Sequence, residues 1–207
     1  MQIAIDSYGA AVQEYLTHNR SYPCATKGRS PVVTSALKTG LWQQFGAVIN
    51  YLERTIRQCP DSLWQHGMWN TEDKPPQFSQ VWYVAYHALF WLDLYLTGSE
   101  EGYLPPEPFM LIEQYDDGPL PERVYTKAEL LLFLSNCRAT CRATIAALTD
   151  ETALRRCEFS WGTASFFELL IYNLRHVQEH AGQINLTLGQ HGVQTADYPT
   201  QLRDSDF

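Results

Sequence analysis

Four segments of the chain carry apolar residues at the spacing of an α-helix. The first is predicted over about 35–58, where apolar side chains recur every three or four positions on a single stripe (Leu37, Leu41, Phe45, Val48, Leu52 and Ile56). The second is predicted over about 79–97 and is apolar almost all round, so we expect it to be buried on most faces. Gly98 is placed to cap its C-terminal end.

The other two predicted helices each begin with a capping box. Thr126-Lys-Ala-Glu129 opens the third helix, which continues to about Thr149, and Ser165-Phe-Phe-Glu168 opens the fourth, which continues to about Leu188. In this motif two side chains satisfy backbone N–H groups that the first turn leaves unpaired. Helices of about 30–36 Å are typical of bundles. The predicted fold class is therefore all-α, a four-helix bundle.

The connections between the helices are unequal. About 28 residues (98–125), several of them proline, join the second and third helices, which is enough to cross a bundle of about 30 Å. We therefore expect these two helices to run parallel, in an up-down-down-up course, with a crossover packed through Tyr103 and Phe109 rather than disordered. The predicted domains are an N-terminal extension (1–34) with a possible short helix near 6–17, the bundle (35–190) and a C-terminal tail (191–207).

Composition narrows the class of protein. Hydrophobic residues make up 45% of 207 residues, which favours a real core over disorder, and no apolar run reaches the roughly 20 residues of a bilayer span. A net charge of −8 argues against nucleic-acid or anionic-membrane partners. Five cysteines without a framework spacing, together with an N-terminus unlike a signal peptide, favour a cytoplasmic location.

Three histidines form the candidate site. His176 and His180 are four residues apart on the fourth predicted helix, so their side chains lie on one face, where both can reach one ion at about 2.0–2.1 Å. His87 sits midway along the most apolar helix, and a buried imidazole there needs a polar partner. Three neutral imidazoles around one divalent ion leave an open position, as in catalytic metal sites.

Other interpretations of these residues remain open. An HxxxH pair also arises by chance, and a backbone carbonyl or a Tyr hydroxyl could satisfy His87 without a metal. His66, in the loop after the first helix, could replace His87 as the third ligand. Cys137 and Cys141 share the same four-residue spacing, but both fall on an apolar stripe and are expected to pack in the core.

The local sequence His176-Val-Gln-Glu179-His180 also matches H-x-x-E-H, in which the Glu would be a general base. That class needs a further carboxylate ligand on a later helix, and no Glu follows Glu179. Glu179 also lies nearly opposite the apolar stripe, so it is expected first of all to face solvent.

The segment His176-Val-Gln-Glu-His180-Ala-Gly-Gln183-Ile184 resembles the H-x-x-x-H-x-G-Q-I signature of the DinB/YfiT-like superfamily. His87 lies where that family has its first metal ligand, and the long crossover agrees with the family's up-down-down-up bundle. The resemblance covers about 35–190. It implies a site of three histidines and water that holds one divalent ion, zinc or nickel, and often a homodimer.

Members of this family with known activity include transferases and isomerases that use low-molecular-weight thiols. The resemblance therefore implies a small-molecule enzyme in which His87, His176 and His180 hold a metal that lowers the pKa of a thiol. A hydrolase that uses metal-bound hydroxide and a non-catalytic binding bundle are the alternatives. Gln183 is the first candidate for orienting a ligand or bound water, and further candidates for orientation or for an acid or base are Asn173, Tyr172, Tyr83 and Tyr86.

Overall fold

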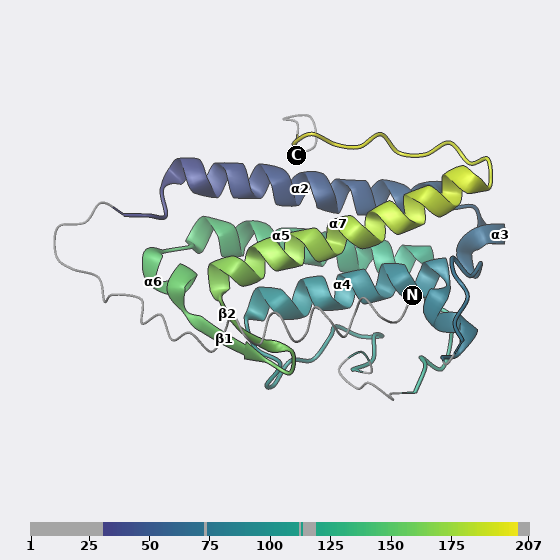
Figure 1. Ribbon diagram of the computed structural model, residues 1–207, viewed down its shortest axis with the longest axis horizontal. Helices are drawn as coiled ribbons and strands as arrows, with labels where there is room; N and C mark the ends of the chain where they lie inside the picture. The colour runs from purple at the N-terminus through teal and green to yellow at the C-terminus, as the bar shows by residue number, and fades with distance from the viewer. Residues whose placement is uncertain (1–30, 73, 112, 114–118, 203–207) are drawn as a thin grey trace. The chain divides into compact units, whose positions relative to one another are not determined.

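The computed structural model describes residues 31–72, 74–111, 113 and 119–202. The chain divides into two compact units, Met1–Pro31 and Val32–Phe207, and the elements that can be described lie in the second. Most of this unit is helical (Figure 1). The short helix predicted near 6–17 lies outside the described residues.

The four predicted helices appear in chain order with smaller elements between them. These elements are α2 (Ser35–Gln58), α3 (Asp61–Trp64), the 3-10 helix η1 (Pro76–Ser79), α4 (Val81–Thr97), α5 (Lys127–Ala147), α6 (Asp150–Leu154), β1 (Arg156–Phe159), β2 (Gly162–Ser165) and α7 (Phe166–Gln190). The observed bounds of the long helices differ from the predicted ones by about two residues, which is the usual uncertainty of helix ends.

Local side chains explain where the long helices begin and end. The side chains of Thr126 and Ser165 each accept a hydrogen bond from the backbone N–H of the Glu three positions on. The side chain of that Glu accepts in turn from the backbone N–H of Thr126 or Ser165, so both predicted capping boxes are confirmed. Gly98 ends α4 in the left-handed conformation, with φ of 79°. Residues with a Cβ rarely adopt this conformation, which explains a glycine at this position.

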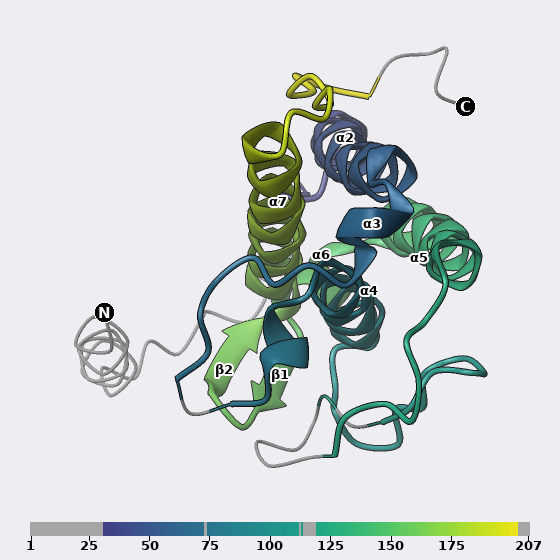
Figure 2. The ribbon, with the colours of Figure 1, turned by 90° about the vertical axis from the view of Figure 1, so that its right-hand side faces the viewer.

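Each long helix packs against two of the others. The α2 helix contacts α5 and α7, and α4 contacts the same two helices from the other side (Figure 2). The α4 helix is buried along most of its length, as its all-round apolar sequence predicts. Cys137 and Cys141 of α5 are fully buried among these helices, so their expected place in the core is confirmed.

A β-hairpin between α6 and α7 was not predicted, and it qualifies the expectation of an all-α fold. The strands pair antiparallel from Arg156↔Ser165 to Phe159↔Gly162 and lie against α7 (Figure 2). Each strand has four residues, so the sequence carries too few alternations to distinguish it from a loop. Cys157 and Phe159 nevertheless turn into the core.

The crossover after α4 packs on the helices, as its aromatic residues predict. Tyr103 and Phe109 are buried, and the Phe109 ring stacks on Phe133 of α5 with 4.6 Å between centroids. The Tyr86 hydroxyl of α4 donates to the Met110 carbonyl at 2.6 Å. These contacts bring the middle of the crossover close to α4.

The C-terminal segment returns over α2. The backbone N–H of Leu202 donates to the Gln43 carbonyl at 3.0 Å, and the Leu202 side chain packs where a Cβ on Gly46 would stand. Among the described helices, none combines the length and the apolar character that a bilayer crossing requires.

Candidate metal centre

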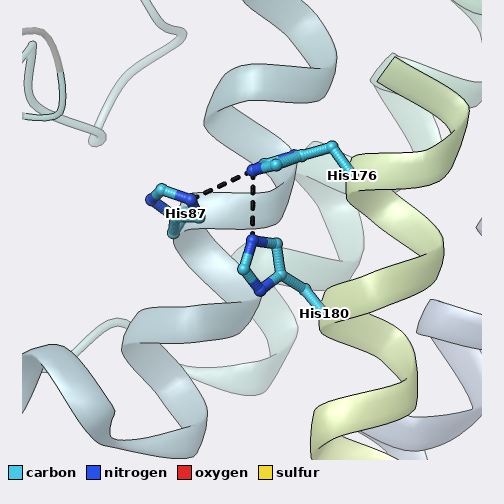
Figure 3. Close-up of side chains that lie close together, drawn as sticks. All are labelled: His87, His176 and His180. Atoms are coloured by element: carbon cyan, nitrogen blue, oxygen red, sulfur yellow. Dashed lines mark hydrogen bonds between the residues drawn. The ribbon is translucent and has the colours of Figure 1, made fainter. Parts of the chain in front are cut away.

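The packing of α4 against α7 brings three imidazoles together. His87 extends from α4, and His176 and His180 extend from one face of α7, so that all three rings meet between the helices (Figure 3). His176 Nε2 lies 3.1 Å from His87 Nε2 and 3.1 Å from His180 Nε2. One nitrogen from each ring lies within 4.8 Å of the others. Three donors bound to one ion at 2.0–2.1 Å would be about 3.3 Å apart, so this spacing is compatible with one ion.

His87 is less buried than its apolar helix predicts. Its side chain is 30% exposed. The partner of its Nδ1 is the Glu113 carboxylate, at 2.5 Å. A carboxylate is an acceptor only, so Nδ1 carries a proton, and in the neutral form of the ring Nε2 presents its lone pair to the other two histidines.

Glu113 is nearly buried, and it stays charged. Burial opposes its ionisation, but His87, Tyr83 and Trp91 together outweigh burial and hold the pKa of this carboxyl below its ordinary value. The Trp91 indole N–H also donates to Glu113 Oε2, at 3.3 Å. Metal-binding histidines commonly donate their second nitrogen to a carboxylate in this way.

Gln183 orients His180 on the opposite side of the site. Its amide Oε1 lies 2.8 Å from His180 Nδ1, while its amide nitrogen donates to Glu179 Oε1 at 3.5 Å. Because a carboxylate only accepts, the group of Gln183 that faces Glu179 is the amide nitrogen, and the group that faces His180 is the amide oxygen. His180 Nδ1 is therefore a donor, and His180 Nε2 also presents a lone pair. Glu179 is exposed, as the sequence predicts, and touches the site only through Gln183.

The lone pairs of His87 and His180 therefore both point toward His176 Nε2. If His176 Nε2 carries a proton, it can donate to only one of these two acceptors; if it does not, three lone pairs face one another. A cation between the rings would satisfy all three at once. His176 Nδ1 is buried and has no hydrogen-bond partner among the described residues, so no neighbour there assigns the tautomer of this ring.

The electrostatics of the pair on α7 also favour neutral rings. Burial, followed by the neighbouring His87, lowers the pKa of His180 to about 4. Burial and the other two histidines hold the pKa of His176 well below its ordinary value. Neutral imidazole is the form that binds a metal, so the pair is ready for binding at neutral pH. The donor set thus fits a divalent cation held by three protein ligands.

The remaining predicted residues lie around the triad without entering it. The Asn173 amide donates to the Leu92 carbonyl at 3.0 Å, which ties α7 to α4. The Tyr172 ring lies nearly parallel to His176, with 6.4 Å between centroids. Tyr86 donates to the backbone of the crossover, and burial followed by Glu113 raises the pKa of Tyr83. Among the described residues, these four side chains make no hydrogen bond to the triad.

The alternative third ligand is excluded by distance along the bundle. His66 packs edge-on against His191, with 4.4 Å between centroids, and it does not belong to the group of close metal-binding atoms. Both residues lie at the end of the bundle where α2 ends and α7 ends. His87 is the histidine that meets the pair.

Glu113 is the site residue that sequence reasoning missed. It lies in a Pro-rich connection, with no helical spacing to any histidine, and other carboxylates lie nearby in the sequence. The only available signal was general: a metal-binding histidine needs an acceptor for its second nitrogen. Nothing in the sequence pattern selects Glu113 over its neighbours.

Comparison with known proteins places this arrangement in a family. The sequence model of the DinB superfamily matches residues 44–184, a range that contains all three histidines. The crystal structure of a DinB-like protein from Bacillus subtilis superposes with a TM-score of 0.52, covering 77% of this chain and 98% of that one. Sequence identity is 12%, so this likeness shows the fold alone. No curated protein sequence is significantly similar to the chain.

Proposed function

Because this chain belongs to the DinB superfamily, we propose that it is a metal-dependent enzyme of small molecules, with one divalent ion held by His87, His176 and His180. The convergence of three Nε2 atoms, on rings of which two are held through Nδ1, is the observation that carries this proposal. A bound cation would supply a Lewis acid that lowers the pKa of a thiol or a water at the remaining position.

The protein's own residues supply orientation. Glu113 holds His87 and Gln183 holds His180, each through the ring nitrogen that faces away from the site. The rings therefore need little rearrangement on binding, which favours affinity and a defined open side. The exposed part of His87 marks that open side, through which a substrate reaches the triad.

Thiol transfer or isomerisation is the reaction that we propose. Imidazole ligands suit zinc and nickel, and either ion stabilises a thiolate. The four cysteines that the structure describes are buried, and burial raises the pKa of each, so none of them is a candidate nucleophile (Cys59, Cys137, Cys141 and Cys157). A thiol would therefore come from a small molecule. The alternative reaction at the same site is hydrolysis, with a hydroxide in place of the thiol.

We also infer that the four long helices form a four-helix bundle with an up-down-down-up course. The colour gradient in Figure 1 runs in one direction along α2 and α7 and in the opposite direction along α4 and α5, which supports this course. The long segment between α4 and α5 supports it as well, because two parallel neighbours need a connection that spans the bundle.

Metal analysis tests the proposed site. We expect the purified full chain to carry close to one equivalent of zinc or nickel, measured by plasma mass spectrometry, because three preoriented imidazoles converge on one point. His176→Ala and His180→Ala should each lose the metal, whereas His66→Ala, which removes a histidine outside the triad, should keep it. A wild-type protein that neither retains nor regains metal would overturn the proposal, as would full retention in both triad variants.

A cobalt-substituted protein tests the proposed reaction class. Addition of 2-mercaptoethanol or cysteine should produce a sulfur-to-cobalt charge-transfer band, because a thiolate would occupy the open position. Acetate at the same concentration is the control for general anion binding. If no thiol changes the spectrum of a fully loaded protein, the thiol reaction is wrong and hydrolysis becomes the better proposal.

A further inference from the structure

Aromatic side chains line one side of the histidine triad and continue to the protein surface. The rings of Trp91 and Tyr95, from α4, pack on each other with 5.1 Å between centroids. Trp91 approaches His87 and Tyr95 approaches His176, each with 6.4 Å between ring centroids. The side of the triad that faces this end of α4 is therefore bordered by aromatic rings.

The β-hairpin extends this border outward. Its two-residue turn places Trp161 beside Tyr172 of α7, with 5.1 Å between centroids and 33° between the ring planes. The Tyr172 ring is nearly parallel to His176 as well, at 22°. Tyr95 contacts both Trp161 and Tyr172 edge-on, so the three rings form one continuous surface. We call Trp91, Tyr95, Trp161 and Tyr172 the aromatic wall.

The outer half of the aromatic wall is open to solvent. Trp161 is 42% exposed and Tyr172 is 37% exposed, whereas Tyr95 beneath them is buried. Scattered exposed aromatic residues are ordinary, but a contiguous exposed patch that adjoins a reactive centre is typical of a ligand-binding surface. Phe159 supports the indole from behind, parallel to it within 4° and at 5.4 Å. This stacking holds Trp161 in place at the tip of the hairpin.

We propose that the aromatic wall binds a flat aromatic or conjugated group of the substrate while the reacting atom of that substrate lies at the histidine triad. This inference rests on the proposed function for the position of the reacting atom. The ring centroids of Tyr95, Trp161 and Tyr172 lie 5.1–6.4 Å apart, so the rings contact one another and offer a surface for stacking rather than a pocket for a compact group. Trp161 is the specificity-determining residue, because it is the most exposed ring of the wall.

Binding of 2-naphthylmethanol to the full-length protein tests the aromatic wall. The metal-free and zinc-loaded proteins should both bind it, because stacking needs no metal, and decahydro-2-naphthylmethanol, which has the same skeleton without a flat ring, should bind more weakly. Trp161→Ala should raise the dissociation constant about 3- to 10-fold, the range of aromatic pair energies. Dissociation constants are measured by ligand-observed NMR.

Two further variants control this experiment. Trp161→Phe keeps a ring on Phe159 and should retain most of the affinity, which separates loss of stacking from damage to the hairpin. Trp69→Ala removes a comparably exposed tryptophan elsewhere and should leave binding unchanged. Undetectable binding to the wild type, equal affinity of Trp161→Ala, or an equal loss in Trp69→Ala would overturn the inference. Naphthyl binding by a protein that takes up no metal would instead contradict the proposed function alone.

Discussion

At the scale of single residues, the candidate site depends on what each histidine does with its second nitrogen. His87 donates to Glu113 and His180 donates to Gln183, so both rings turn a lone pair toward the site. His176 has no such partner among the described residues. A metal ion at the site would meet two rings held by hydrogen bonds and one held by packing alone.

Glu113 provides the sharpest test at this scale. Glu113→Gln should weaken zinc binding by about 10- to 100-fold, the usual effect of losing a carboxylate that orients a metal-binding histidine. Competition with a fluorescent chelator measures the affinity. Glu107→Gln, which neutralises an exposed carboxylate of the same crossover, should have no effect. Unchanged affinity in Glu113→Gln would show that the carboxylate does not orient His87 for binding.

At the scale of elements, short-range contacts decide where helices begin and end. Both predicted capping boxes form, and Gly98 ends α4 with a positive φ. The end of α4 also meets the start of the hairpin, because Arg155 donates to the Thr97 carbonyl at 3.1 Å. Gly98 therefore matters in two ways: its backbone needs a positive φ, and it lies where the end of α4 meets Arg155.

Gly98→Ala should therefore destabilise the fold. A side chain in the left-handed region costs about 1–2 kcal/mol, and the new Cβ would lie 2.4 Å from Arg155 Nη2 and force that side chain away. A loss of about 1–2 kcal/mol lowers the melting temperature of a chain of this size by roughly 2–8 °C, measurable by calorimetry. Gly102→Ala is the control, with a similar φ of 73° and no atom near the new Cβ. An equal effect of both changes would mean that Arg155 contributes nothing.

At the scale of the whole molecule, the atoms that could hold a metal ion come from two helices that are far apart in sequence. His87 belongs to α4 and the pair belongs to α7, so the triad exists only when these helices pack together. The same packing brings Glu113 of the crossover to His87, and Trp161 of the hairpin to Tyr172 beside His176.

The sequence by itself determined the four long helices and the shared face of His176 and His180. Apolar periodicity, capping boxes and a four-residue spacing all act within a few positions along the chain, so they can be recognised locally. His87 has no local link to the pair; its place midway along the most apolar helix made it a candidate, and the resemblance to a known family supported it.

Only the tertiary structure decided that Glu113 faces His87, that His87 remains partly exposed and that Trp161 reaches Tyr172. Glu113 lies in a connection without periodicity, and Trp161 lies in a hairpin too short to show alternation. Contacts of this kind depend on how separate segments pack. No spacing rule along the chain encodes that packing.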